Sequence, residues 1–140
     1  MNTTLTWLEG RMVKSVSYDP ETDQWSFDFG DKVVLQIGSP WRVMKNDGIA
    51  HGHLDHGQQF GLPEPVDGEA RAADLLKDRA ACAATVVHGS ADLIVDFGSG
   101  VRLEVFNNSS GYEGWLLHAP DGRSVIAQGG GRLVEWNRGP

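Results

Sequence analysis

Residues 25–37 read WSFDFGDKVVLQI and residues 93–105 read LIVDFGSGVRLEV, which are two versions of one pattern. In each version, apolar and polar residues alternate on both sides of a glycine-containing turn, the sequence signature of a β-hairpin. The two versions lie 68 residues apart, and their apolar positions match. The pattern therefore predicts two pseudo-equivalent halves, with internal repeats at residues 8–61 and 76–136.

The alternation also fixes the register of the first hairpin. The apolar residues of its two arms share one face only if Trp25 pairs with Ile37 and the following pairs stay in step, because side chains along a strand alternate with a period of two. This register needs a three-residue loop at 30–32. Loops of this length favour a left-handed residue at their third position, which suits Gly100 of the second hairpin better than Lys32 of the first.

The remaining chain adds a second hairpin to each half and one helix between the halves. The second hairpins begin at Trp41 and Trp115 and turn at Asp-Gly pairs, which are strong turn signals. Residues 65–80 are rich in alanine and leucine, which favours a helix, and Asp67 is suited to cap its N-terminus. The face of this helix that packs on the protein is expected to contain Val66, Ala70, Ala73, Leu76 and Ala80.

Together these elements predict an α+β fold that is mostly antiparallel β, with roughly ten strands and one connecting helix. The apolar faces of the repeated units are expected to pack against each other. We therefore expect a single sandwich-like or barrel-like domain over residues 1–140. A chain of this length can bury a sizeable core without disulfides, and its 40% hydrophobic residues, with five tryptophans, supply that core.

The composition also narrows the classes of function. The net charge of −7 disfavours binding to nucleic acid and to anionic membranes. No apolar run approaches the roughly 20 residues that span a bilayer, and the N-terminus lacks the basic and apolar regions of a signal peptide. We therefore expect a cytoplasmic protein. Its one cysteine, Cys82, is expected to be a buried, reduced thiol.

A histidine-rich segment, HGHLDH at residues 51–56, has the composition of a metal site. Neutral imidazoles and a carboxylate are good zinc ligands, and water bound to zinc can reach a pKa of about 7. The segment resembles the HxHxDH motif of the metallo-β-lactamase superfamily, but the likeness covers these residues alone, and the glycine pair that follows the motif in that family is absent. Two readings stay open: a zinc site, or an exposed loop without a metal. The ligands of the zinc site would be His51, His53, Asp55 and His56.

Two stretches depart from the repeat, at residues 51–61 and 107–114, and together with the GSPWR segment at 38–42 they make up one candidate surface. Functional residues concentrate in loops that a rigid scaffold holds, and aromatic residues and arginine are typical of protein recognition. The sequence therefore predicts a protein-binding surface here. Its expected residues are Trp41, Arg42, His56, Gln58, Gln59, Tyr112, Glu113 and Trp115.

Four strings resemble those of a family of small bacterial proteins of unknown function: GSPWR at 38–42, DHGQQFGLP at 55–63, EVFNNSSGYEGW at 104–115 and AQGGG at 127–131. The likeness spans nearly the whole chain. Families of this kind often include immunity and accessory proteins of bacterial toxin systems. The resemblance therefore implies a binding protein, and it assigns a role to no single residue.

Three hypotheses of function result. The first is a non-catalytic cytosolic module, monomeric or homodimeric and without a cofactor, that binds another protein and acts as an immunity protein or inhibitor. Its acidic charge would favour encounter with a basic partner. The second is a metal-dependent hydrolase that uses the HGHLDH segment. The third is a small-molecule binder with its pocket between the two halves.

Overall fold

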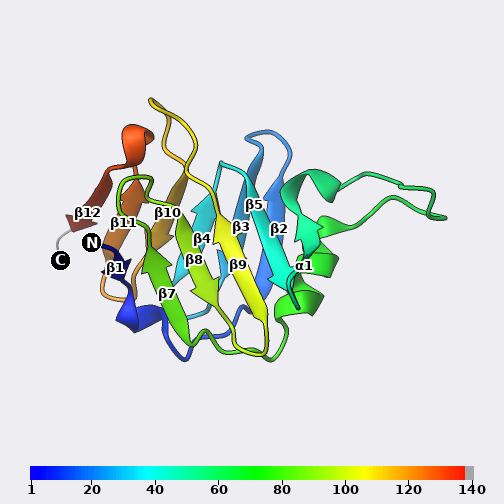
Figure 1. Ribbon diagram of the computed structural model, residues 1–140, viewed down its shortest axis with the longest axis horizontal. Helices are drawn as coiled ribbons and strands as arrows, with labels where there is room; N and C mark the ends of the chain where they lie inside the picture. The colour runs from blue at the N-terminus through cyan, green and yellow to red at the C-terminus, as the bar shows by residue number, and fades with distance from the viewer. Residues whose placement is uncertain (138–140) are drawn as a thin grey trace.

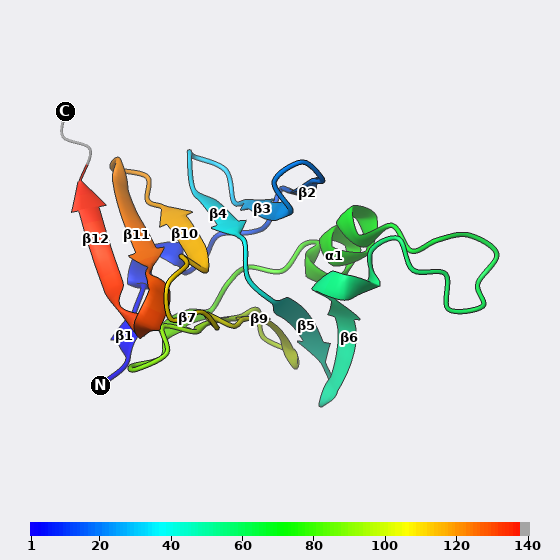
Figure 2. The same cartoon turned by 90° about the horizontal axis from the view of Figure 1, so that it is seen from above.

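The computed structural model describes residues 1–137, which form two six-stranded sheets packed face to face, with a helix at one end (Figures 1 and 2). Sheet I has the order β1 (Thr3–Thr4), β7 (Ala83–Val86), β8 (Leu93–Asp96), β9 (Val101–Val105), β5 (Trp41–Lys45) and β6 (Gly48–Gly52). Sheet II has the order β12 (Leu133–Asn137), β11 (Arg123–Ala127), β10 (Trp115–His118), β4 (Val34–Ile37), β3 (Gln24–Asp28) and β2 (Ser15–Asp19). All pairings are antiparallel, so the predicted fold class is confirmed in its sandwich form.

The register predicted for the first hairpin is confirmed. Trp25 lies opposite Ile37, and the N–H of Phe29 donates to Val33 O at 2.8 Å across the three-residue loop 30–32. In both hairpins all three loop residues, and not only the third, have positive φ. The aspartate before each Phe-Gly pair contributes to this turn, because its carboxylate accepts the N–H of the glycine two residues later at 2.8 Å.

The two halves exchange strands. β4 of the first half pairs with β10 of the second, and β9 of the second half pairs with β5 of the first. Each sheet therefore combines the first hairpin of one half with the second hairpin of the other (Figure 1). The runs β2-β3-β4-β10-β11 and β7-β8-β9-β5-β6 have matching order, while the 68-residue repeat itself stays a prediction.

The core lies between the inner faces of the two sheets. Alternate residues of the central strands are buried, as the expected packing of apolar faces requires. The largest side chains that are fully buried include Trp41, Trp115, Phe27, Leu35, Ile37, Leu103 and Leu117. Because apolar side chains from both sheets form this one cluster, the core between the sheets is packed with protein side chains. A hollow between residues of the two halves does occur at the surface, between Lys32 and residues 118–123.

The helix α1 (Gly68–Leu76) is shorter than the expected 65–80 and covers the open end of the sandwich beside β2. Its N-cap is confirmed, because Asp67 Oδ1 accepts the N–H of Ala70 at 3.1 Å. The expected face was partly wrong, since Ala70 and Ala80 are exposed. Gly68, Ala72 and Leu76 are the buried residues of α1, spaced by four along one face.

Cys82 is exposed, so its expected burial was wrong. It lies just before β7, where the chain leaves the bridge that Ala80 forms with Met12. Its Sγ donates to Asp96 O at 3.2 Å. Ala84 and Val86 are the buried residues of β7, so an alternation extended back along the chain would bury Cys82. The strand begins only at Ala83, and before it Ala81 is the buried residue instead.

Candidate functional site

The side chains of the HGHLDH segment serve the local backbone. The segment runs from β6 into the 3₁₀ turn η2 (His53–Asp55). Three backbone N–H groups donate to it: Trp41 to His53 Nδ1 (3.3 Å), Gly52 to Asp55 Oδ2 (2.9 Å) and Gly68 to His56 Nδ1 (2.9 Å). An imidazole nitrogen that accepts such a bond has no lone pair left for a metal. Among residues 1–137, no cluster of three or more His, Cys, Asp or Glu side chains is arranged to hold a metal ion.

His51, the first residue of this segment, is fully buried beneath the Trp41 ring, 5.6 Å away between centroids. The reading of the segment as an exposed loop is therefore wrong for this residue. Its Nδ1 lies 3.8 Å from Asp55 Oδ2, and neither ring nitrogen has a hydrogen-bond partner among the described residues. Burial lowers the pKa of His51, and this effect outweighs the opposing charge of Asp55. The imidazole is consequently neutral at pH 7.

This burial predicts a loss of stability in mild acid. The unfolded chain binds a proton at His51 near pH 6.5, whereas the folded imidazole, with its lowered pKa, does not. The stability contributed by His51 is therefore complete above about pH 6.5 and falls as the pH drops toward the folded pKa. Urea unfolding between pH 7.5 and 5, as an approximate range around the histidine pKa, measures this slope. His51→Leu should flatten the slope and the exposed-site control His88→Gln should retain it, whereas equal slopes in both variants would contradict the assignment.

Two tryptophans of the expected binding surface lie in the core instead. Trp41 is 1% exposed and Trp115 is 2% exposed. Trp41 begins β5 and Trp115 begins β10, and each of these strands pairs with a strand of the other half. Both side chains therefore pack between the two sheets. The indole Nε1 of Trp115 donates to Ala91 O at 2.8 Å. Both indole rings thus belong to the core, and neither side chain is exposed.

The other expected residues of the surface do not form one patch. Gln58, Gln59, Tyr112 and Glu113 are exposed, whereas His56 is half-buried between the rings of Tyr18 and Trp25. The loop 107–114 packs against the 3₁₀ turn η3 (Gly129–Gly131), where Gly130 N–H donates to Ser109 O at 2.8 Å. The segment 57–66 leaves the sandwich beside α1, at the end that lies away from the loop 107–114 (Figures 1 and 2). The two loops are therefore separate.

A different feature stands out at the β5–β6 end. Half of the large apolar side chains that are exposed among residues 1–137 fall in one short stretch: Ile49, Leu54, Phe60 and Leu62. Two of these line an open pocket of about 320 Å³ on the outer side of sheet I, which we call the apolar pocket. Its lining includes Pro40, Arg42, Ile49, Leu54, Asp55 and Phe106. This volume is at the lower end of the roughly 300–1,000 Å³ of small-molecule sites, and it suits one or two side chains.

The other two exposed apolar residues lie on the segment 57–66, which we call the projecting loop. Backbone bonds tie its stem, because Gly57 N–H donates to Val66 O at 2.9 Å and Val66 N–H donates to Gln58 O at 2.8 Å. At its tip, Leu62 N–H donates to Gln59 O at 2.7 Å across two residues with positive φ, Phe60 at 48° and Gly61 at 76°. These features define a tight type I′ turn. The loop is therefore a preformed arm that extends beyond the sandwich (Figure 2).

An ion-pair network borders the apolar pocket. Glu104 accepts the Nε–H of Arg42 at 2.7 Å and the Nε–H of Arg102 at 2.8 Å. Burial raises the pKa of Glu104, but the hydrogen bonds from the two arginines outweigh it and hold this pKa below its ordinary value. The Arg42 guanidinium also lies 5.0 Å from the centroid of the Phe106 ring, a cation–π contact. Two positive charges thus share one carboxylate here.

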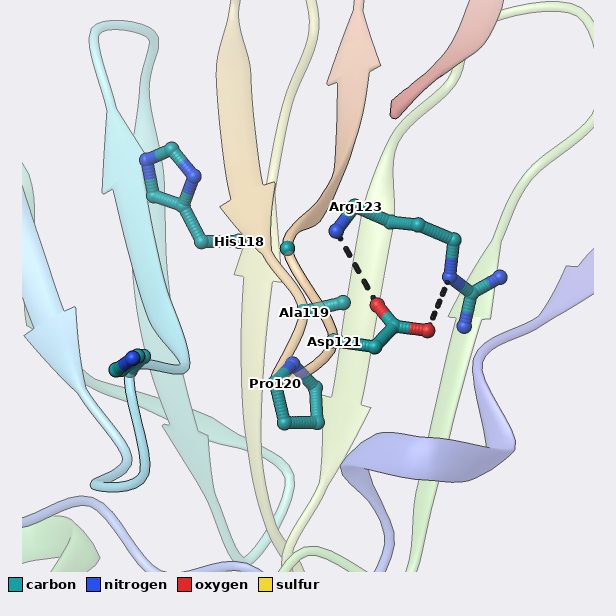
Figure 3. A pocket seen from close by; sticks show the side chains of 7 residues that line it. His118, Ala119, Pro120, Asp121 and Arg123 are labelled. Atoms are coloured by element: carbon teal, nitrogen blue, oxygen red, sulfur yellow. Dashed lines mark hydrogen bonds and ion pairs between the residues drawn. The ribbon is translucent and has the colours of Figure 1, made fainter. Parts of the chain in front are cut away.

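A larger hollow of about 470 Å³ lies between Lys32 and the β10–β11 turn, residues 118–123 (Figure 3). Hydrogen bonds hold several of its polar groups. Asp121 accepts the backbone N–H and the Nε–H of Arg123, shown as two dashed lines in Figure 3, and the backbone bond is the main cause of the lowered pKa of Asp121. His118 Nδ1 lies 3.1 Å from Ser124 Oγ. These pairings stabilise the turn.

Comparison with known proteins places the chain in a family but attaches no activity to it. No curated protein and no solved structure matches the chain. Among residues 1–137, no helix combines the length and apolar character that crossing a membrane requires. A family model does match, over residues 4–137, and the chain thus belongs to the Family of unknown function (DUF6188).

Proposed function

We propose that this protein is a non-catalytic protein-binding module whose contact surface consists of the projecting loop and the adjacent apolar pocket. In this proposal it acts in the bacterial cytoplasm as an inhibitor or immunity protein, as the resemblance noted in the sequence implies. The tip of the loop enters an apolar cleft of the partner, and the rim of the pocket completes the contact. Preformed binding elements of this kind lose little conformational entropy on association.

The observation that carries this proposal is the state of Phe60. Its side chain is 66% exposed, and its φ of 48° lies in the left-handed region that bulky residues avoid. That conformation costs about 1–2 kcal/mol, and the exposed ring returns little burial energy to the protein itself. Strained residues held in place by their surroundings are typical of functional sites. Aromatic anchors are also frequent among the residues that dominate binding energy.

The test compares Phe60→Ser with a matched control, Tyr112→Ser, which removes an aromatic ring that is 83% exposed on the other loop. Each tagged variant is expressed in the native host, and the proteins that copurify are quantified by mass spectrometry. A specific partner should be recovered with wild type and Tyr112→Ser and lost with Phe60→Ser. With the purified partner, Kd should rise about 30-fold or more, the effect of losing an anchor worth about 2 kcal/mol. Equal recovery with all three proteins would refute the role of Phe60.

A further inference from the structure

We propose that the free edge of β12 binds an extended segment of another polypeptide, which adds to sheet II as a further antiparallel strand. This edge lies at the end of the sandwich away from α1 and the projecting loop (Figure 2). The inference goes beyond the proposed function, because it gives the protein a second contact surface that does not involve Phe60. It rests on the direction of the backbone groups of β12, on the state of the other sheet edges, and on the space beside β12.

The backbone groups of alternate β12 residues point away from the sheet. In β11, Ala127 O accepts the Gly114 N–H at 3.0 Å on the β10 side, so the odd-numbered residues of β11 face β10. Leu133 and Glu135 of β12 lie opposite such residues, Ala127 and Val125, and their own N–H and C=O groups therefore face the free edge. Within residues 1–137 these groups have no hydrogen-bond partner. Donors and acceptors in such a row are satisfied by another extended backbone.

The other three sheet edges are protected. The helix α1 packs beside β2, where Glu69 of the helix accepts the Tyr18 N–H at 3.1 Å. The register of β6 against β5 is irregular, and Asp55 accepts the Gly52 N–H at the end of β6. The strand β1 has only two residues. A covering helix, an irregular register and a very short strand all hinder the addition of a strand. By contrast, β12 pairs with β11 over five residues in continuous register.

Two hollows on the inner side of β12 have room for side chains of an added strand. The first, of about 380 Å³, is lined by Leu133 and Trp7, and the second, of about 320 Å³, by Leu133 and Val86. Arg123 and Glu135, an ion pair at 3.2 Å, complete the lining of the first hollow. Residues directly opposite each other in an antiparallel pair project to the same face. The residues that pair with Leu133 and Glu135 would therefore enter these hollows, and we expect the bound segment to have apolar residues at alternate positions.

Isothermal titration calorimetry of the full-length protein with the acetylated, amidated peptide KVTVTVK tests the inference. Its valines fit the inner side, and in an antiparallel pair their N–H groups face β12. One peptide should bind per protein molecule. N-methylation of two valines should weaken binding about tenfold or more, because two backbone hydrogen bonds are lost. N-methylation of two threonines, whose N–H groups point away from β12, should change the affinity by no more than about twofold.

Substitutions in β12 test the same bonds from the side of the protein. Glu135→Pro removes an N–H that faces the free edge, so it should abolish peptide binding and leave the bonds to β11 intact. Glu135→Ala is the matched control, because it removes the carboxylate and keeps this N–H, and it should retain binding. Val134→Pro removes an N–H that faces β11. In urea unfolding, its midpoint should therefore be clearly lower than that of Glu135→Pro.

The outcomes separate this inference from the proposed function. The inference is overturned if no peptide binds up to about 1 mM, or if the two kinds of N-methylation weaken binding equally. A wild-type dimer that Glu135→Pro disrupts, without peptide binding, would also overturn it, because the edge would then bind a second copy of the chain. Phe60→Ser should bind the peptide as wild type does, so a failure of partner capture through Phe60 leaves this inference standing. Circular dichroism of each variant verifies that the fold is unchanged.

Discussion

Phe27→Ala should lower the free energy of unfolding by about 3–5 kcal/mol, the usual cost of truncating a buried phenylalanine. Phe27 is fully buried in β3 and its ring packs edge-on against Trp41, with centroids 5.1 Å apart. The two aromatic rings belong to different sheets, so the cavity left by the substitution would lie across the contact between the layers. A loss of this size is a large share of the roughly 5–15 kcal/mol that stabilise a typical domain.

Urea unfolding followed by far-ultraviolet circular dichroism measures this loss as a lower midpoint with an unchanged slope. Tyr112→Ala is the matched control, because it removes an aromatic ring that is 83% exposed and should change the free energy by no more than about 0.5 kcal/mol. If Phe27→Ala were as mild as this control, the two sheets would not be held together by the contact described.

Gly131→Ala should destabilise the protein by about 2–5 kcal/mol, the sum of left-handed strain and overpacking. Gly131 ends η3 with a φ of 93°, and a Cβ atom there would collide with the carbonyl oxygen of Gly89 and come within 3.1 Å of Ser90 Cα. Both obstacles are backbone or close to it, so they cannot move aside as a flexible side chain could. The effect therefore measures how closely the β11–β12 connection approaches the β7–β8 connection.

Gly10→Ala isolates the strain component of this prediction. Gly10 has a comparable φ of 84°, but an added Cβ there meets no atom within 4 Å. Its substitution should cost only the left-handed penalty, about 1–2 kcal/mol. Thermal unfolding of both variants, analysed at a common temperature, gives the difference. Equal losses at the two positions would mean that the close approach at Gly131 contributes nothing.

The hairpin register could be predicted from the sequence because it depends on a local rule. Trp25 and Ile37 must share a face, and side-chain alternation leaves one loop length that allows this. The N-cap at Asp67 was predictable for the same reason, since a short polar side chain before an alanine-rich run satisfies a nearby N–H. The helix face was partly mistaken because alanine is common on both sides of that run, and composition alone does not say which alanines are covered.

The exchange of strands between the halves was not predictable from these patterns. The second hairpins, which begin at Trp41 and Trp115, have similar alternation, and each could pair with either first hairpin. The choice depends on contacts between residues far apart in sequence, such as Ile37 with Trp115. The same exchange explains why two tryptophans next to irregular loops are core residues, since they begin the strands that cross over.

The exposed apolar residues lie beside the histidine-rich segment that the sequence singled out, and the roles expected of the site residues stay predictions. Histidines attracted attention because their chemistry is specific, yet each of the four expected ligands either accepts a backbone hydrogen bond or is buried. The more informative signal was Phe60-Gly61-Leu62, apolar residues in a stretch otherwise made of Gly, Gln, Pro and Glu. Such residues in a turn-forming segment have no strand or helix through which to reach a core, and they are therefore exposed.

The exchanged strands also constrain the time at which the protein can fold during its synthesis. The first half cannot complete its own sheet, because β4 obtains its second neighbour, β10, only when residues 115–118 have left the ribosome. In the same way, β5 obtains its second neighbour only after β9 has been made. Most of the chain must therefore be made before either layer closes, and the first hairpin is exposed until then. Pairings between such distant residues are slow to form, and unpaired strand edges are prone to aggregate in the meantime. We therefore expect an unfinished chain of this protein to expose unpaired strand edges until late in its synthesis.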